Sequence, residues 1–274
     1  MMRKRNVAVV MLLAALFLVT IVNAQDFSSK TIQSNYQVLS KTQQGMDDFD
    51  EQIKSILKLF SSLVGSGFVN TASLHHVGGI DVGVRGVFAK IPDEFKQIVP
   101  SNVSGVKDPW SGTNLVPLPF LHGSLGLPAN FEVMAKFFTF PLADEPGGNI
   151  TLLGGAVKYG LLKDNLALPA ITVLAGYQTI LVPEDYAFGT VSTLSLKGYI
   201  SKNFSIATLY AGGGIDRTAL TIDIPGIITR DYNLVYPNGT VGLTISPLPL
   251  FKVNADFNFG EVKNFTAGVG LSIR

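Results

Sequence analysis

Apolar and polar side chains alternate along residues 149–206, which is typical of β-strands. Three extended runs follow one another here, Ile150–Leu162, Ala167–Val182 and Thr190–Lys202, and a fourth begins at Phe204. Successive side chains of a strand point to opposite faces, so each run has two distinct sides. The connections between the runs are short, then longer, then short. Long strands joined in this way predict an up-and-down antiparallel barrel, here one that spans a membrane.

The same period of two continues through the rest of the chain from Ser73 onward. The further runs are Ile80–Phe88, Pro117–Leu127, Asn130–Phe140, Phe204–Asp223, Asp231–Ser246, Phe251–Phe259 and Phe265–Ile273. Together these runs predict about ten strands. The pair Asn238-Gly239 is a strong hairpin signal that would add strands, so the predicted range is about eight to twelve. The glycines at 212–214 predict a bulge or bend in their strand.

The N-terminal residues 1–24 have the form of a secretory signal peptide: a basic start, an apolar run and small residues before Gln25. We expect cleavage after Ala24, a flexible leader over 25–45, a helix and linker over 46–72, and the barrel over 73–274. The mature chain then has 18 basic and 20 acidic side chains. No basic face indicates a nucleic-acid partner. The chain has no cysteine, so a large core or a closed sheet must stabilise it.

A membrane barrel explains these strands better than a soluble β-protein does. Every backbone N–H and C=O inside a bilayer needs an internal partner, so a membrane sheet must close. The predicted strands are longer than the ~5–6 residues usual in soluble sheets. Aromatic residues lie near many strand ends, where the membrane interface favours Tyr and Trp. They are Phe88, Phe120, Phe131, Phe140, Tyr159, Tyr177, Tyr199, Phe204, Phe251 and Phe265.

The last strand carries the most specific motif, Thr266-Ala267-Gly268-Val269-Gly270-Leu271, with the order polar-x-Gly-apolar-x-apolar. In this, and in its strand pattern over Ser73–Arg274, the chain resembles Gram-negative outer-membrane β-barrels, in particular an uncharacterised barrel family with an N-terminal helix. The resemblance implies residence in the outer membrane, contact with its lipid, and recognition of the last strand by the barrel-assembly machinery. The chain departs from many such barrels because it ends Ser272-Ile273-Arg274 and not in an aromatic residue.

An amphipathic helix is predicted before the strands, with Asp47 as N-cap and Gly65 at its end. Its apolar positions share one helical face: Phe49, Ile53, Ile56, Leu57, Phe60, Leu63 and Val64. Such a helix either plugs the lumen, lies on the membrane surface, or packs on the periplasmic mouth of the barrel. We favour the mouth, because a narrow barrel is filled by its own side chains.

Candidate chemistry is sparse. His122 and Ser124 lie on one face of a strand, and Glu132 follows across the next turn. This His-x-Ser arrangement resembles that of outer-membrane lipopolysaccharide deacylases, and a nucleophilic Ser needs such a base and acid. The opposite face carries leucines, however, so lipid contact through them would turn His122 and Ser124 toward the lumen. We therefore expect no enzyme, no metal and no cofactor.

Charged side chains on the expected lumen face are candidates for ligand contact. They are Asp81, Arg85, Glu132, Lys136, Lys158, Lys197 and Lys252, together with the polar Gln178. They either set the selectivity of a pore or pair with one another in a closed barrel. Two strands, over residues 131–140 and 170–182, are apolar on both faces, which indicates either a lumen for hydrophobic ligands or tight packing.

The expected function is passive passage or binding of a small molecule, with a hydrophobic one included. The alternative is a structural or adhesion barrel that acts through the long connection Lys90–Leu115. A lipid-modifying enzyme at His122 and Ser124 is the third hypothesis. The sequence predicts no oligomeric state.

Overall fold

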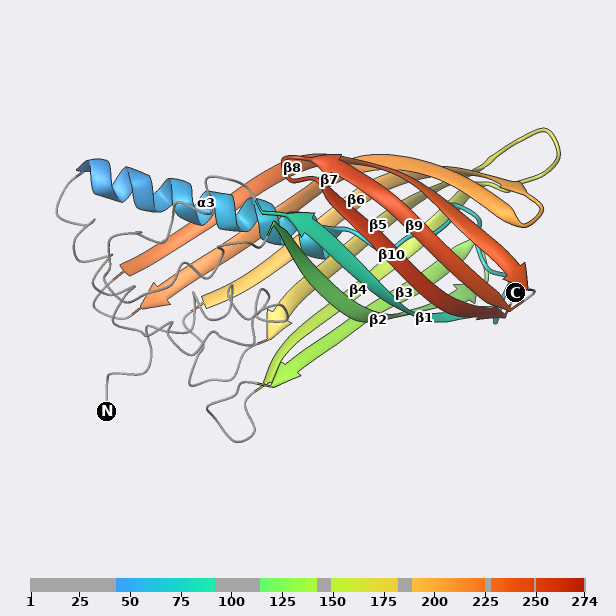
Figure 1. Cartoon of the computed structure of the whole chain (residues 1–274), viewed down its shortest axis with the longest axis horizontal. Helices are drawn as coiled ribbons and strands as arrows, with labels where there is room; N and C mark the ends of the chain where they lie inside the picture. Colours follow the sequence, from blue (N-terminus) through green and yellow to red (C-terminus); the bar gives the residue numbers. More distant parts are fainter. Residues whose placement is uncertain are drawn as a thin grey trace.

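The computed structural model describes residues 43–91, 114–141, 149–181, 189–224, 228–248 and 250–273. In this part of the chain one helix, α3 (Gln43–Gly65), precedes ten strands (Figure 1). The strands are β1 (Ile80–Lys90), β2 (Leu115–Leu127), β3 (Phe131–Pro141), β4 (Asn149–Leu162), β5 (Ala170–Leu181), β6 (Gly189–Phe204), β7 (Ala207–Ile224), β8 (Ile228–Leu248), β9 (Phe251–Gly260) and β10 (Asn264–Ile273). The predicted signal peptide, most of the leader and most of the connection between β1 and β2 lie outside the described residues.

The strands form a closed, all-antiparallel barrel in which each strand pairs with its neighbours in sequence. β1 and β10 close it, in a register that runs from Ile80 opposite Ile273 to Ala89 opposite Asn264. Closure gives the backbone of every strand a partner on both sides, as a bilayer requires. The predicted ten-stranded up-and-down barrel with a preceding helix is therefore confirmed.

Two local features that the sequence left open, a turn at Asn238-Gly239 and a bulge at the glycines 212–214, do not form. Asn238 and Gly239 form no turn but lie within β8, where they pair with Gly214 and Gly213 of β7. The glycines at 212–214 form no bulge, because the pairing of β7 continues through them on both sides without a shift in register. These glycines serve close approach instead. A Cβ atom on Gly214 would lie 2.1 Å from the carbonyl oxygen of Leu196 in β6.

The two ends of the barrel differ. At one end, called the turn end here, lie the β2–β3, β4–β5, β6–β7 and β8–β9 connections, the C-terminal end of β10 and the start of β1. The other end, called the loop end, bears the β1–β2, β3–β4, β5–β6, β7–β8 and β9–β10 connections. The β9–β10 connection is short, and β9 ends at Gly260 opposite Asn238. β7 and β8 extend further toward the loop end than Gly260 does, so the barrel wall is taller on the side of these two strands.

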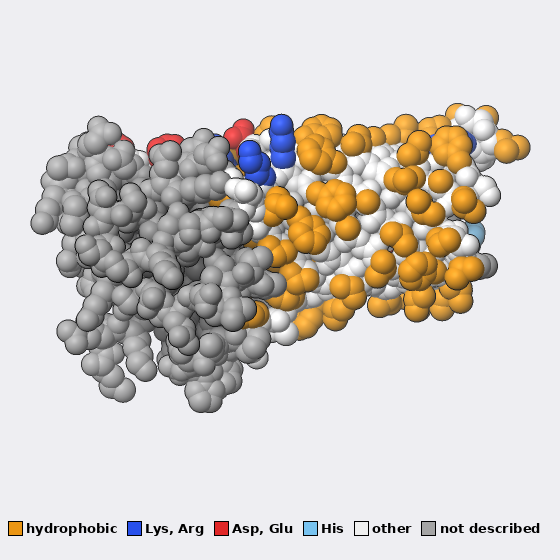
Figure 2. All heavy atoms as spheres, viewed as in Figure 1, with side chains coloured by type: hydrophobic (Ala, Val, Ile, Leu, Met, Phe, Trp, Pro, Cys, Tyr) orange, Lys and Arg blue, Asp and Glu red, His pale blue; other side chains and the backbone are white. Residues whose placement is uncertain are grey.

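The outer face of the barrel is apolar in the predicted phase. On β1, Val82 and Val84 are exposed, whereas Asp81 and Arg85, which flank them, are buried. Figure 2 shows the same on the visible face, where hydrophobic and uncharged side chains cover the wall and basic side chains appear beside the loop end. Aromatic pairs such as Phe131 with Tyr159, whose ring centroids are 4.8 Å apart, also lie on the outer face. This alternation matches a sheet with lipid outside and a polar interior.

The helix lies inside the barrel, so the prediction that it packs on the periplasmic mouth is wrong. α3 enters from the loop end and ends in the lumen (Figure 1). Its C-terminal half is buried on nearly all sides, including Leu59, which lies outside the predicted apolar face. Ten strands enclose a lumen that their own side chains do not fill. Among the described residues, no helix has both the length and the hydropathy to cross a bilayer.

We expect Gly214→Ala to destabilise the barrel, because its methyl group would press against the backbone of β6. Overpacking of this kind typically costs ~1–3 kcal/mol. The matched control is Gly198→Ala on β6, where the nearest atom to an added Cβ is the Thr172 carbonyl oxygen at 4.0 Å. The temperature at which the folded form loses its altered gel mobility measures the effect. Equal temperatures for both variants would contradict the prediction.

Candidate functional site in the barrel lumen

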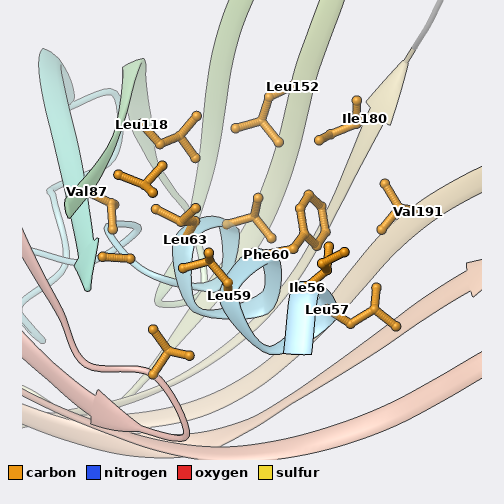
Figure 3. Packing of buried hydrophobic residues seen from close by; sticks show 14 of the residues in the cluster. Ile56, Leu57, Leu59, Phe60, Leu63, Val87, Leu118, Leu152, Ile180 and Val191 are labelled. Carbon is orange, nitrogen blue, oxygen red and sulfur yellow. The ribbon is translucent and has the colours of Figure 1, made fainter. Parts of the chain in front are cut away.

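The lumen is occupied by the chain's own residues 43–79, which comprise α3 and the segment that leads to β1. We call these residues the plug. In the loop-end half of the lumen, α3 packs against inward-facing apolar side chains of the wall (Figure 3). Leu59 and Leu63 of the helix, for example, belong to one buried cluster with Val87, Leu118 and Leu152 of the strands. A second buried cluster joins Met134 and Leu174 of the wall to Phe68, Val69 and Ala72 of the plug. Contact with the plug, and not an open hydrophobic lumen, thus explains the strands that are apolar on both faces.

The C-terminal end of the helix is bound by two lysines of the wall. Lys136 on β3 donates hydrogen bonds to the carbonyl oxygens of Val64, at 2.9 Å, and Ser66. Lys197 on β6 donates to the carbonyl oxygen of Gly65 at 2.8 Å. The last carbonyls of a helix have no intrahelical partner and carry partial negative charge. Buried cations at this end therefore satisfy both the hydrogen bonds and the helix dipole.

Arg85 on β1 binds the plug one step further on. Its Nη1 donates to the carbonyl oxygens of Gly67, at 2.7 Å, and Phe68, at 3.0 Å. The ring of Phe68 lies under the ammonium group of Lys136, with 3.7 Å between the nitrogen and the ring centroid. In the described part of the chain, neither Arg85 nor Lys136 has a carboxylate within 4.0 Å. The plug backbone is their main acceptor.

The turn-end half of the plug has no regular secondary structure, and polar groups of the wall hold it. Lys158 donates to the carbonyl oxygens of Thr71 and Ser73, at 3.3 and 3.2 Å. The backbone N–H of His75 donates to Glu132 at 3.0 Å. Irregular backbone at membrane depth is tolerated only where protein or water satisfies it. Here the side chains of the wall do so.

The other lumen charges pair with one another. Lys158 lies 3.2 Å from Glu132, Lys197 lies 3.0 Å from Asp216, and Lys252 lies 2.9 Å from Asp81. The predicted lumen residues are all buried inside the barrel. Asp81, Glu132, Lys158, Lys197 and Lys252 form ion pairs there, whereas Arg85 and Lys136 bind the backbone of the plug. Sequence reasoning missed two lumen carboxylates, Asp216 of β7 and Asp256 of β9. Asp216 follows the glycines at 212–214. Alternation along β9 placed Asp256 on the inward face, but the sequence indicated no partner for it.

The candidate catalytic residues face the lumen but do not form a triad. Within the described residues, the two ring nitrogens of His122 have no hydrogen-bond partner, and the Oγ of Ser124 has none either. Glu132 binds His75 and Lys158 instead. A nucleophilic serine needs its base within hydrogen-bond reach, which this arrangement does not supply. Among the described residues, His75 and His76 belong to no group of three or more His, Cys, Asp or Glu side chains that could hold a metal ion.

Several polar groups of the wall are left unused by the plug. Within the described residues, buried atoms without a hydrogen-bond partner include those of His122, Ser124, Thr172, Gln178 and Asn254. Buried polar groups are normally paired with protein or with ordered water. The wall therefore offers more polar groups than the plug satisfies. At the turn end, a cavity of about 420 Å³ opens beside the plug, lined among others by Leu74, His76 and Lys163.

Comparison with known proteins identifies a family without a known role. The model of one protein family, described as a family of unknown function (DUF6588), matches residues 98–273 of the chain. No curated protein matches the sequence.

The solved structures that resemble the chain include outer-membrane barrels. The N-terminal β-barrel domain of Pseudomonas aeruginosa OprF is 13% identical with a TM-score of 0.31, over 73% of this chain and 98% of that one. Ail of Yersinia pestis, in complex with the heparin analogue sucrose octasulfate, is 13% identical with a TM-score of 0.29, over 72% and 99%. The outer membrane protease OmpT of Escherichia coli is 10% identical with a TM-score of 0.37, over 71% and 95%. These similarities concern the fold alone.

We expect Lys136→Met to destabilise the protein, because it leaves the carbonyls of Val64 and Ser66 buried without a donor. Such a loss typically costs ~1–3 kcal/mol. Lys163→Met, the same change at an exposed lysine, serves as the control. Denaturant unfolding in detergent measures the free energy of unfolding. A Lys136→Met variant as stable as the control would show that the lysine does not hold the plug.

Proposed function

The chain belongs to the DUF6588 family of unknown function, and we propose that it is an outer-membrane barrel whose N-terminal plug gates the passage of a small molecule. The plug consists of residues 43–79, as above. The polar wall of the turn-end half suits a polar path, and the apolar side chains that contact α3 suit a hydrophobic molecule. The proposal assigns the protein no catalytic activity.

Residence in a membrane is supported by the two faces of the wall. The outer face exposes large apolar side chains on every strand, from Val82 on β1 to Leu271 on β10. Exposed apolar area of this extent is a liability in water and is stabilised by lipid. The closed sheet leaves no edge at membrane depth. Heat-modifiable gel mobility of the membrane-extracted protein tests for such a detergent-resistant barrel.

The single observation that carries the gating proposal is the surplus of polar groups on the lumen wall. A permanently packed interior would be apolar or would have its hydrogen bonds satisfied. Here His122, Ser124 and Gln178 face the plug with atoms that lack partners among the described residues. Water or a solute would satisfy them once the plug moved. The turn-end segment of the plug, which has no helix or strand of its own, is the part whose release needs the fewest apolar contacts broken.

Displacement of the plug can be blocked by a disulfide. The Oγ1 of Thr71 in the plug and the Oγ of Ser201 on β6 lie 3.2 Å apart, and the chain has no native cysteine. We expect Thr71→Cys/Ser201→Cys to show no openings in planar-bilayer recordings when oxidised, and to regain the openings of the wild type after reduction. The single variants Thr71→Cys and Ser201→Cys are the controls. Openings that persist after the disulfide has formed would exclude the plug segment as the gate.

The second candidate function is a structural or adhesion barrel. The filled lumen favours it, since a barrel that only anchors outer loops needs no path through its centre. The loop proposed to act, Lys90–Leu115, lies almost wholly outside the described residues. A wild type that never opens, under reducing conditions and at any applied voltage, would support this candidate over gated passage.

One substitution tests the hypothesis that the protein is a lipid-modifying enzyme. We expect Ser124→Ala to leave the acylation of lipid A unchanged, because the hydroxyl faces the plug and has no hydrogen bond to His122. Mass spectrometry of lipid A from cells that express the wild type, the variant or neither protein measures this. Loss of an acyl chain with the wild type, but not with the variant, would overturn the non-enzymatic proposal.

A further inference from the structure

The plug runs through the barrel in one direction, from the loop end to the turn end. Near its start, Asp50 accepts hydrogen bonds from Arg230 and Tyr232, just after the first residue of β8 at the loop end. Its middle is held by Lys136 and Lys197, as described above. Its last residues reach the turn end, where the N–H of Gly78 donates to the carbonyl of Gly126 at 2.9 Å.

The start of the helix stands beyond the apolar band of the wall. On the outer face of β7 and β8, the apolar side chains Ile215 and Val235 are succeeded toward the loop end by exposed polar ones. These polar side chains are Arg217, Thr221, Asp231 and Asn233, and they bond to one another in pairs. Exposed polar side chains are costly in contact with lipid tails, so this part of the β7–β8 hairpin projects into water. Asp50 is bound to Arg230 and Tyr232 on this same projecting hairpin.

We propose that the chain crosses the outer membrane inside its own barrel and displays the start of α3, around Asp50 and Glu51, on the cell surface. Bacterial barrels place short turns in the periplasm and longer loops outside. The C-terminal end of β10 then stays periplasmic, whereas the start of α3 emerges with the loops. The barrel thereby presents the start of its helix as a surface element, held to the rim by Asp50. The proposal rests on the membrane insertion proposed above, but it does not require that the plug ever moves.

The anchor at the rim explains why the exit is at this point. Asp50 bridges two side chains, at 2.8 Å from Arg230 Nη1 and 2.7 Å from the Tyr232 hydroxyl. On the low side of the rim, Lys58, about two helical turns further along, lies 3.2 Å from Glu261 in the β9–β10 connection. The helix is therefore fixed to both the high and the low side of the loop-end rim, which defines where α3 leaves the barrel.

Cysteine labelling on intact cells tests this topology, because the chain has no native cysteine to interfere. Glu51→Cys places the thiol at an exposed position on the helix. Asp231→Cys marks the outer face of the projecting hairpin, and Leu166→Cys marks the turn end, where Leu166 is fully exposed. We expect a membrane-impermeant maleimide to label Glu51→Cys and Asp231→Cys on intact cells. Leu166→Cys should react only after the outer membrane has been permeabilised.

Two outcomes would overturn the inference. If Asp231→Cys reacts on intact cells but Glu51→Cys does so only after permeabilisation, the plug does not thread to the surface. If Leu166→Cys reacts on intact cells and the other two do not, the barrel has the opposite orientation. Heat-modifiable mobility of each variant is measured in parallel. Its loss would show a failure of the barrel itself, which is distinguishable from a wrong orientation.

Discussion

The structure depends on a reciprocal need between the lumen wall and the plug. Arg85 and Lys136 are buried cations without a carboxylate within 4.0 Å in the described chain, and burial of an unpaired charge is costly. The carbonyls at the end of α3 and just beyond it are buried acceptors without backbone partners. Each set satisfies the other, at distances from 2.7 Å for Arg85 to Gly67. Neither the charged wall nor the irregular segment would be stable at membrane depth alone.

The lumen has two halves, in which different interactions hold the plug. In the loop-end half, apolar side chains of α3 and of the wall bury one another, which stabilises the helix without direction or charge. In the turn-end half, the plug is held through hydrogen bonds from Lys158 and to Glu132, and through a smaller apolar cluster that includes Phe68 and Leu174. Hydrogen bonds can be exchanged for bonds to water at small net cost, whereas apolar packing cannot. Apolar packing is therefore the main contribution in the loop-end half and a lesser one in the turn-end half.

The strands were predictable because their signal is local. Alternation along β6, for example, places Lys197 inward and Leu196 outward without any knowledge of the neighbouring strands. The position of the helix was not predictable in the same way. Leu59 lies off the apolar face of α3 and is nevertheless buried, and this residue was the available signal for a helix enclosed on all sides. Asn238-Gly239 left the strand count open for the opposite reason, because this strong local turn signal competes with strand pairing on both sides of β8, and the pairing prevails.

The amino-acid pattern alone was enough to establish the class of the molecule: about ten strands, their phase, the apolar exterior and the charged residues of the interior. Period-two alternation is a property of each strand alone, so it survives without the fold. What the interior charges bind became visible only in the folded barrel. Besides carboxylates of the wall, their partners are backbone carbonyls of residues that lie up to 132 positions away, as for Lys197 and Gly65. Every residue has a backbone carbonyl, so no pattern of side chains predicts which carbonyls will serve as acceptors. The contacts between lysines and carbonyls form only once the barrel has closed around the plug.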